Sequence, residues 1–159
     1  VYKRQELKGG GSADICKFIT EYNKELGGFA GVRPTHPVII LFDNDSGAKP
    51  IRSVIRNTTK QEVMADVSFI HLVKNMYAVP TPGSGSKIED FFDDVTKRRK
   101  IAGKSFNDGK DFDTSMHFGK KIFAHMIVKP HAGTIDFSGF RPLLTSLTAA
   151  IRDYQAKIV

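Results

Sequence analysis

A continuous apolar run, Val38 to Phe42, stands between Pro37 and a polar turn at residues 44–47. Five consecutive apolar residues bounded by turn-forming residues are typical of a strand that is buried on both faces. Such a strand lies in the middle of a sheet. We therefore expect a central strand over residues 37–43, with the rest of the chain arranged around it.

Helical spacing marks the region before this strand. Glycines 9–11 and the capping residue Ser12 come first, and the apolar positions behind them are Ile15, Phe18, Ile19, Tyr22 and Leu26. This pattern predicts a flexible loop and then an amphipathic helix. The free N–H groups at such a helix start can bind an anion. No Gly-Lys-Ser/Thr closes the loop, so a plain helix entry is the alternative interpretation.

A short helix and two strands are predicted after the turn. The inward positions of the helix are Ile51, Val54 and Ile55. Residues 57–60 are expected to end it, and the apolar runs 67–73 and 76–79 predict the strands. A strand, a helix and a strand in succession favour parallel pairing through a right-handed crossover.

The carboxyl half of the chain is predicted to contain two more helices. Apolar positions from Phe118 to Ile127 mark the first, which Pro130 is expected to stop. The second opens near Ser138, and its expected core face comprises Phe140, Leu143, Leu144, Leu147, Ile151 and Tyr154. Together these patterns predict an α/β fold with a mostly parallel central sheet flanked by helices, in a single domain over residues 1–159.

Composition limits the classes of protein to which the chain can belong. Its 159 residues carry 24 Lys and Arg against 17 Asp and Glu, and the net charge of +7 favours polyanionic partners. The single Cys16 excludes an internal disulfide, and no apolar stretch reaches membrane-spanning length. We therefore expect a soluble, cytoplasmic protein. Because the sequence begins at Val1 rather than Met, we also expect a piece of a longer chain.

Two acids, Asp43 and Asp45, leave the carboxyl end of the predicted strand, where open α/β sheets bind ligands. Residues two apart in an extended segment point to the same side, so both carboxylates can face one point. Neighbouring carboxylates repel each other, and a divalent cation such as Mg²⁺ or Mn²⁺ relieves that repulsion. The pair is therefore a candidate metal site.

The neighbouring residues separate the known uses of Asp-x-Asp. A calcium loop of the EF-hand type is excluded, because its twelfth position requires Glu and is Val54 here. A phosphatase would use Asp43 as the nucleophile and Asp45 as the acid. A metal site for phosphodiester chemistry would use both as ligands, with Glu89 as a third carboxylate and Lys104 as a cation for the developing charge.

A basic run, Lys97-Arg98-Arg99-Lys100, is the candidate nucleic-acid contact. Acids before this run and bases within it also suit the dipole of a plain helix, which is the alternative interpretation. The histidines show no spacing typical of zinc ligands: His36, His71, His117, His125 and His131. A zinc site is therefore not expected.

Four segments resemble a known family: Val38–Gly47, Lys87–Phe92, Gly103–Phe106 and Ile135–Phe140. In this order they are similar to the TOPRIM-type module at the carboxyl end of certain bacterial retron reverse transcriptases. The resemblance extends over nearly the whole chain, from Gly9 to Tyr154. It implies a fold related to the TOPRIM domains of topoisomerases, primases and OLD-family nucleases.

The resemblance also implies a function. It indicates a Mg²⁺-dependent nuclease effector in anti-phage defence, attached to an RNA-directed DNA polymerase that makes a branched RNA–DNA hybrid. RNA, including tRNA, is the expected substrate. Asp43 and Asp45 match the family's acidic pair, Glu89 matches a later acid, and Lys104 matches a basic residue that could stabilise a phosphorane-like charge.

One part of the family pattern has no counterpart. TOPRIM modules carry a glutamate on an earlier strand, and Glu6 does not match it because Glu6 lies in a basic, polar context. We therefore expect the sequence to lack the first strand and helix of the module, and we do not expect full activity from residues 1–159 alone.

Two other functions remain open. A ribonuclease H-type activity on an RNA–DNA hybrid would also use clustered acids and Mg²⁺. A non-catalytic docking module would hold the hybrid through the basic run Lys97–Lys100, with structural acids.

Overall fold

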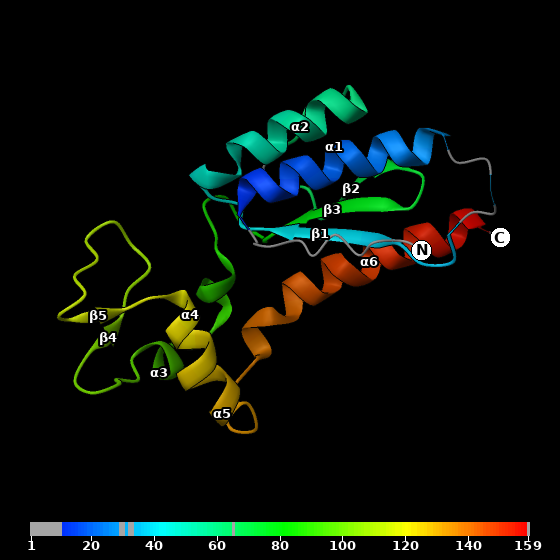
Figure 1. The fold of residues 1–159 in the computed structure, drawn as a ribbon. Coiled ribbons are helices and arrows are strands. Elements are labelled where there is room, and N and C mark those ends of the chain that lie inside the picture. Colours follow the sequence, from blue (N-terminus) through cyan, green and yellow to red (C-terminus); the bar gives the residue numbers. More distant parts are fainter. Residues whose placement is uncertain (1–10, 29–30, 32–33, 65, 159) are drawn as a thin grey trace. The chain divides into compact units, whose positions relative to one another are not determined.

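The computed structural model describes residues 11–28, 31, 34–64 and 66–158, whose elements are drawn in Figure 1. The described residues up to Lys87 and from Pro142 onward form one compact unit, and Ile88–Arg141 form a second. The expected single domain stays a prediction. The predicted glycine loop at residues 9–11 falls mostly outside the described residues, as does Glu6.

A three-stranded sheet organises the first unit. Its strands are β1 (Val38–Phe42), β2 (Ile70–Val73) and β3 (Met76–Pro80), in the spatial order β1-β3-β2. All five residues of β3 are buried. Among the described strands, the central position therefore belongs to β3, and the prediction that residues 37–43 form the central strand was wrong.

The sheet is mixed, so the prediction of a mostly parallel sheet was wrong for one of its two strand pairs. β1 pairs with β3 in parallel, whereas β2 pairs with β3 antiparallel. The crossover helix leads into β2, which does not pair with β1, and a tight turn at Lys74 and Asn75 then returns the chain. Asn75 fixes this turn, because its backbone oxygen accepts the Val38 N–H at 2.8 Å and its Nδ2 donates to the His36 oxygen at 2.9 Å. The hairpin thus places β3 rather than β2 beside β1.

Helices cover both faces of this sheet (Figure 1). α1 (Ser12–Gly28) and α2 (Lys49–Thr59) pack together on one face, and α6 (Arg141–Ile158) lies on the other. The core under α1 and α2 comprises Ile19, Ile40, Phe42, Ala48, Ile51, Ile55, Leu72, Met76 and Ala78. On the α6 side, the rings of Tyr77 and Tyr154 meet edge to face at 6.2 Å. The coarse prediction of an α/β fold with flanking helices is confirmed.

The ends of α2 follow from its sequence. Pro50 occupies the first turn, where its missing N–H costs nothing. Thr58 and Thr59 return hydrogen bonds to backbone oxygens four residues earlier, and the helix ends where Lys60 adopts a left-handed conformation with φ of 59°. Of residues 57–60, which were expected to end the helix, the first three are still helical, and only Lys60 terminates it. The inward positions Ile51 and Ile55 are buried as expected.

The buried face of α6 differs from the predicted stripe. Leu143, Ser146, Ala150 and Tyr154 are buried, whereas Leu144 and Ile151 are 57% and 38% exposed. The small side chains of Ser146 and Ala150 let the helix approach the sheet closely. The inner face therefore combines two residues of the predicted stripe, Leu143 and Tyr154, with the small residues Ser146 and Ala150.

The second unit is built from short elements around phenylalanine rings. They are η2 (Ile88–Phe91), α3 (Asp94–Lys97), β4 (Ser105–Phe106), β5 (His117–Phe118), α4 (Lys120–Ile122), η3 (Phe123–Val128), α5 (Lys129–His131) and η4 (Ser138–Phe140). β4 and β5 form a parallel pair. Phe118, Phe123 and Ile127 are the buried core, and Phe92 packs edge to face on Phe123 at 5.3 Å.

A single helical run contains α4, η3 and α5, and η3 is a π-helix. Its widened turn closes where the Lys129 N–H donates to the Ala124 oxygen, five residues earlier. Pro130 then occupies the first turn of α5. The run ends at His131, one residue beyond Pro130, so the prediction that the helix stops at this proline is confirmed to within one residue.

None of the helices in the described part of the chain is both long enough and apolar enough to cross a lipid bilayer.

Candidate functional site

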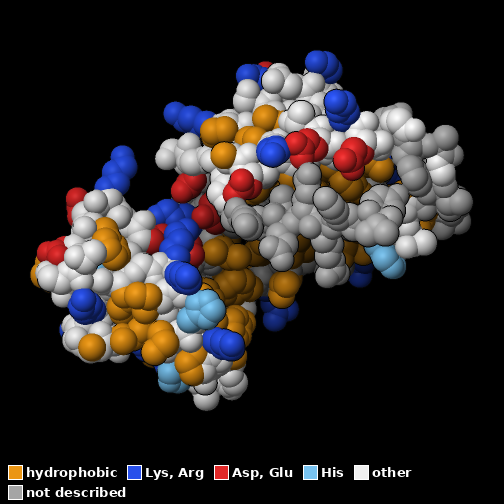
Figure 2. All heavy atoms as spheres, viewed as in Figure 1, with side chains coloured by type: hydrophobic (Ala, Val, Ile, Leu, Met, Phe, Trp, Pro, Cys, Tyr) orange, Lys and Arg blue, Asp and Glu red, His pale blue; other side chains and the backbone are white. Residues whose placement is uncertain are grey.

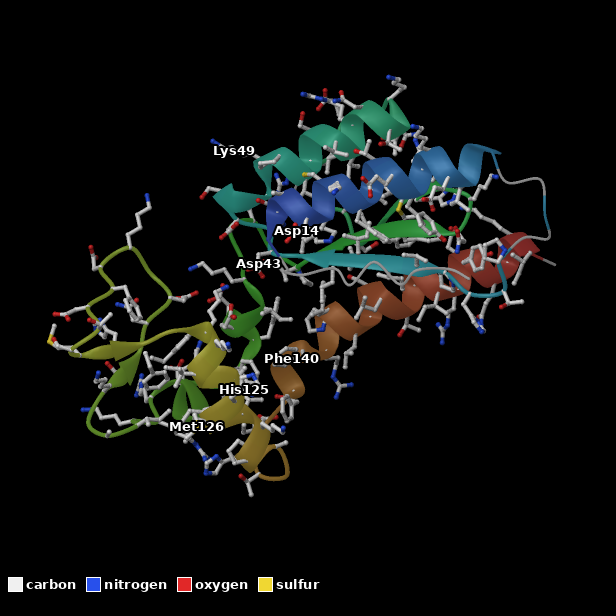
Figure 3. All side chains as sticks on the ribbon, in the orientation of Figure 1. Asp14, Asp43, Lys49, His125, Met126 and Phe140 are labelled. Atoms are coloured by element: carbon white, nitrogen blue, oxygen red, sulfur yellow. The ribbon has the colours of Figure 1, made fainter. Side chains whose placement is uncertain are left out.

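Asp43 and Asp45 follow β1 and leave its carboxyl end, as the sequence predicts. Figure 3 labels Asp43 at this position. Asp45 has extended backbone angles and caps the short helix η1 (Ser46–Ala48), because its Oδ1 accepts the Gly47 N–H at 2.8 Å. Asp14 in the first turn of α1 and Lys49 in the first turn of α2 lie at this same end of the unit (Figure 3).

Asn44, between the two acids, is the residue that organises this end of the unit. The residue is only 3% exposed. Its backbone N–H donates to the Ser86 oxygen at 2.8 Å and to Thr81 Oγ1 at 2.9 Å, and its backbone oxygen accepts the Gly85 N–H at 2.9 Å. These bonds fix the strand end against the loop after β3.

The Asn44 side chain adds two more contacts. Its Nδ2 donates to the Gly83 oxygen at 3.0 Å, and its Oδ1 accepts a hydrogen bond from Arg52 Nη2 of α2. Asn44 therefore connects β1, the 81–86 loop and α2. Sequence reasoning missed this residue, and the only signal for it was its position between two acids at a strand end.

Burial alternates across the three residues: Asp43 is half-buried, Asn44 buried and Asp45 half-buried. This is the pattern of an extended segment in which the outer two residues share a side. The fixed Asn44 thus supports the interpretation that both carboxylates face one region at the surface.

The loop after β3 contains several hydrogen bonds of its own. Thr81 Oγ1 and Ser86 Oγ lie 2.7 Å apart, and Ser86 Oγ also donates to the Gly83 oxygen at 2.8 Å. Gly83 and Gly85 have φ of 91° and 79°, in the left-handed region where a side chain would cause strain. The loop that the sequence predicts is therefore closed by its own hydrogen bonds.

Glu89, the predicted third carboxylate, belongs to the second unit, whereas Asp43 and Asp45 belong to the first. Its side chain is buried, and its Oε2 lies 2.7 Å from Lys120 Nζ. The sequence did not indicate this ion pair. Within its own unit, Glu89 is thus a charged partner of Lys120.

Lys104, the predicted cation, also lies in the second unit and holds a loop there. Its Nζ donates to the Thr114 oxygen at 2.6 Å. Asp113 beside it accepts hydrogen bonds from the Ser115 hydroxyl and N–H, both at 2.7 Å, and these bonds lower the Asp113 pKa. Lys104 therefore has a structural partner in the loop that leads to β5.

The basic run Lys97–Lys100 begins inside the one-turn helix α3. Lys97 and Arg98 form ion pairs with Asp94 at 3.5 and 3.3 Å. Asp93 caps this helix, and the hydrogen bonds that it accepts from Thr96 lower the Asp93 pKa. Half of the run is thus partly neutralised by an acid of the same turn.

Metal-binding groups are sparse in the part of the chain that the structure describes. No cluster of three or more His, Cys, Asp or Glu side chains there is placed to hold a metal ion. His71, His117 and His131 contact backbone N–H or C=O groups instead. A metal at Asp43 and Asp45 would therefore have these two carboxylates as its ligands from the first unit.

A basic pocket on α2 is a second feature that sequence reasoning missed. It has a volume of about 220 Å³ and is lined by Lys49, Arg52, Ser53, Arg56, Glu62 and Val63. Figure 2 shows Lys and Arg side chains over α2, on the outer side of the first unit. The spacing of the three cations, at helix positions i, i+3 and i+7, was the available signal.

Comparison with known proteins gives no family assignment: no family model matches the chain, and no solved structure matches it.

Proposed function

We propose that this chain is a TOPRIM-like, Mg²⁺-dependent nuclease module that hydrolyses RNA phosphodiesters, as the effector of a retron reverse transcriptase in anti-phage defence. The observation that carries the proposal is the fixed Asp43-Asn44-Asp45 segment. It leaves the carboxyl end of β1, and the loop after the parallel strand β3 is bound to it. This is where open α/β sheets bind their ligands.

The donor set suits Mg²⁺. This ion keeps several waters and is usually held by one or two carboxylates together with substrate phosphates, so a complete protein cage is not required. Asp43 and Asp45 would hold it. When bound, Mg²⁺ would polarise the phosphoryl oxygen and activate water.

The residues around the pair have separate tasks in this proposal. Asn44 keeps the two carboxylates on one side of the segment. Arg52, which Asn44 orients, can donate hydrogen bonds to a phosphate oxygen. The roles of Glu89 as a further ligand and of Lys104 as the charge-stabilising cation stay predictions from the sequence; within the second unit, these residues contact Lys120 and the Thr114 oxygen.

Calorimetric titration with Mg²⁺ and Mn²⁺ tests the site. We expect binding by the parent chain and its loss in the Asp43→Asn/Asp45→Asn variant. Glu21→Gln/Glu25→Gln is the matched control, because it also removes two carboxylates and both residues are exposed on α1. Equal metal binding by all three proteins, or none by the parent, would overturn the metal site.

Substrate choice tests the reaction. Cleavage of single-stranded or structured RNA supports the proposed nuclease, whereas selective cleavage of the RNA strand in a hybrid supports a ribonuclease H-type activity instead. Both should disappear in the Asp43→Asn/Asp45→Asn variant.

The second candidate function is a docking module for nucleic acid. The net charge of +7 favours it, as does the lack of a three-ligand cluster among the described residues. Nucleic-acid binding that is unchanged by EDTA, with no cleavage of any substrate, would favour this function.

A further inference from the structure

We propose that the basic pocket on α2 binds the sugar-phosphate backbone of RNA and guides it to the Asp43–Asp45 site. The inference rests on the proposed function for the identity of the polymer. It assigns the main nucleic-acid contact to Lys49, Arg52 and Arg56 rather than to Lys97–Lys100.

The geometry of α2 places these cations in one row. Lys49, Arg52, Ser53 and Arg56 are spaced at i, i+3, i+4 and i+7, so they share the outer face of the helix. Ile51 and Ile55 fix the opposite face in the core. The row spans about 10 Å along the helix, at 1.5 Å per residue. At the ~3.4 Å per phosphate of one strand in double-stranded DNA, this length corresponds to about three phosphate spacings.

Arg52 connects the pocket to the candidate metal site. One of its guanidinium donors is bonded to Asn44, the residue between Asp43 and Asp45. Arginine has five N–H donors in a rigid plane, so the remaining donors have a fixed direction and can bind phosphate oxygens. A backbone held by Arg52 is therefore adjacent to the segment that carries the two carboxylates.

The other side chains of the pocket allow an anion to enter. Arg56 pairs with Glu62 at 3.6 Å, and both side chains are mostly exposed, at 53% and 80%. An exposed pair of this kind contributes little stability, so Arg56 can exchange Glu62 for a phosphate. Ser53 adds a hydroxyl to the lining, and Val63 adds an apolar surface for a sugar.

The pocket suits a polymer better than a small anion. Its cations form a row along a helix, and the row leads toward the Asp43–Asp45 segment. One acid, Glu62, opposes the three cations, which leaves a net positive lining.

The test is fluorescence anisotropy of a labelled single-stranded RNA with the full chain in EDTA, where no metal-dependent cleavage occurs. Lys49→Gln/Arg56→Gln removes two exposed cations and leaves the Arg52–Asn44 bond intact. Lys97→Gln/Arg98→Gln is the control with the same loss of charge. We expect about tenfold weaker binding for the first variant, with a salt dependence reduced by ~1.4 in slope, and little change for the control.

Glu62→Gln supplies a test in the opposite direction. Removing the one acid of the pocket should tighten RNA binding, and unchanged or weaker binding would count against the pocket. Equal losses in the two double variants, or a larger loss in Lys97→Gln/Arg98→Gln, would overturn the proposal. Complete displacement of RNA by millimolar inorganic phosphate would do so too, because it would assign the pocket to a small anion.

These outcomes are separate from those of the nuclease proposal. Binding in EDTA does not depend on Asp43 and Asp45 as metal ligands. If the chain binds RNA through α2 but does not bind Mg²⁺, the proposal for the α2 pocket is supported and the nuclease proposal is contradicted.

Discussion

The Tyr77 hydroxyl donates a hydrogen bond of 2.7 Å to Asp153 Oδ2, and this bond joins the central strand β3 to α6. Lys157 Nζ lies 2.6 Å from the same oxygen. Tyr77 itself is completely buried. The Tyr77–Asp153 hydrogen bond therefore helps to hold α6 against the sheet.

Tyr77→Phe removes only this hydrogen bond. Because a bond to a charged acceptor contributes roughly 1.5–3 kcal/mol, we expect a loss of about 2 kcal/mol in the free energy of unfolding. Urea denaturation followed by circular dichroism measures it. Phe18→Tyr, at a half-buried position of α1, adds a hydroxyl without touching this bond and is the control for aromatic substitution. An unchanged midpoint for Tyr77→Phe would contradict the role of the bond.

The same contact predicts a pH dependence. The hydrogen bonds from Lys157 and then from Tyr77 lower the Asp153 pKa, and burial raises the Tyr77 pKa. A carboxylate with a lowered folded-state pKa stabilises the fold above its unfolded pKa of about 3.9, and this stability is lost as the pH falls through the folded value. The stability difference between the parent and Asp153→Asn should therefore shrink below about pH 4. A difference that stays constant from pH 7 to pH 3 would contradict this assignment.

Asn44→Ala should damage the candidate site and the fold together. It removes one of the hydrogen bonds to the Gly83 oxygen and takes the Asn44 acceptor away from Arg52 Nη2, and an unsatisfied buried group costs about 1–3 kcal/mol. We expect about 2 kcal/mol of destabilisation and weaker Mg²⁺ binding, measured by urea denaturation and calorimetry. Asn57→Ala, at an exposed position of α2, should stay within about 0.5 kcal/mol of the parent.

Gly139→Ala tests the packing of the second unit. A Cβ at this position would lie 2.3 Å from the Phe91 backbone oxygen, which cannot move without shifting η2. Overpacking of this kind costs about 1–3 kcal/mol, so we expect a lower melting temperature. Gly133→Ala is the matched control, because nothing lies within 4 Å of a Cβ there. Equal melting temperatures for the two variants would show that η4 adjusts freely.

Lys120→Met separates two roles of Glu89. It leaves a buried carboxylate without its cation, and breaking a partly buried pair in this way costs about 2 kcal/mol or more. Thermal unfolding should show the loss, and Lys121→Met, on an exposed neighbour, is the control. If Glu89 only serves this pair, Glu89→Gln will leave Mg²⁺ affinity unchanged. A fall in that affinity would support Glu89 as a ligand.

Local patterns in the sequence predicted local structure well. The buried positions Ile51 and Ile55 follow from helical spacing, and Asp43 and Asp45 follow from the end of an apolar run. The same spacing correctly indicated Leu143 and Tyr154 on the inner face of α6, but it did not indicate the small residues between them. The burial of Ser146 and Ala150 depends on how closely they approach a sheet whose strands are distant in the sequence.

The arrangement of the sheet and of the site depends on contacts between distant residues. Asn75 fixes the hairpin that places β3 beside β1, and Asn44 is buried because residues 81–86 fold over it. Neither asparagine carries a pattern that indicates burial. The sequence also gave no indication of the contacts of Glu89 with Lys120 and of Lys104 with Thr114. The partners come many positions later, in a short helix and a loop.

The π-helix η3 gives the helical run one residue more than an α-helix would need for the same turn. In an α-helix each residue advances about 100° around the axis, so η3 absorbs the extra residue and restores the direction of the side chains in the next turn. Natural variation in length can therefore occur inside this helix without a loop. A related chain that is shorter by one residue between Phe123 and Val128 should keep Phe123 in the core and continue as a regular α-helix.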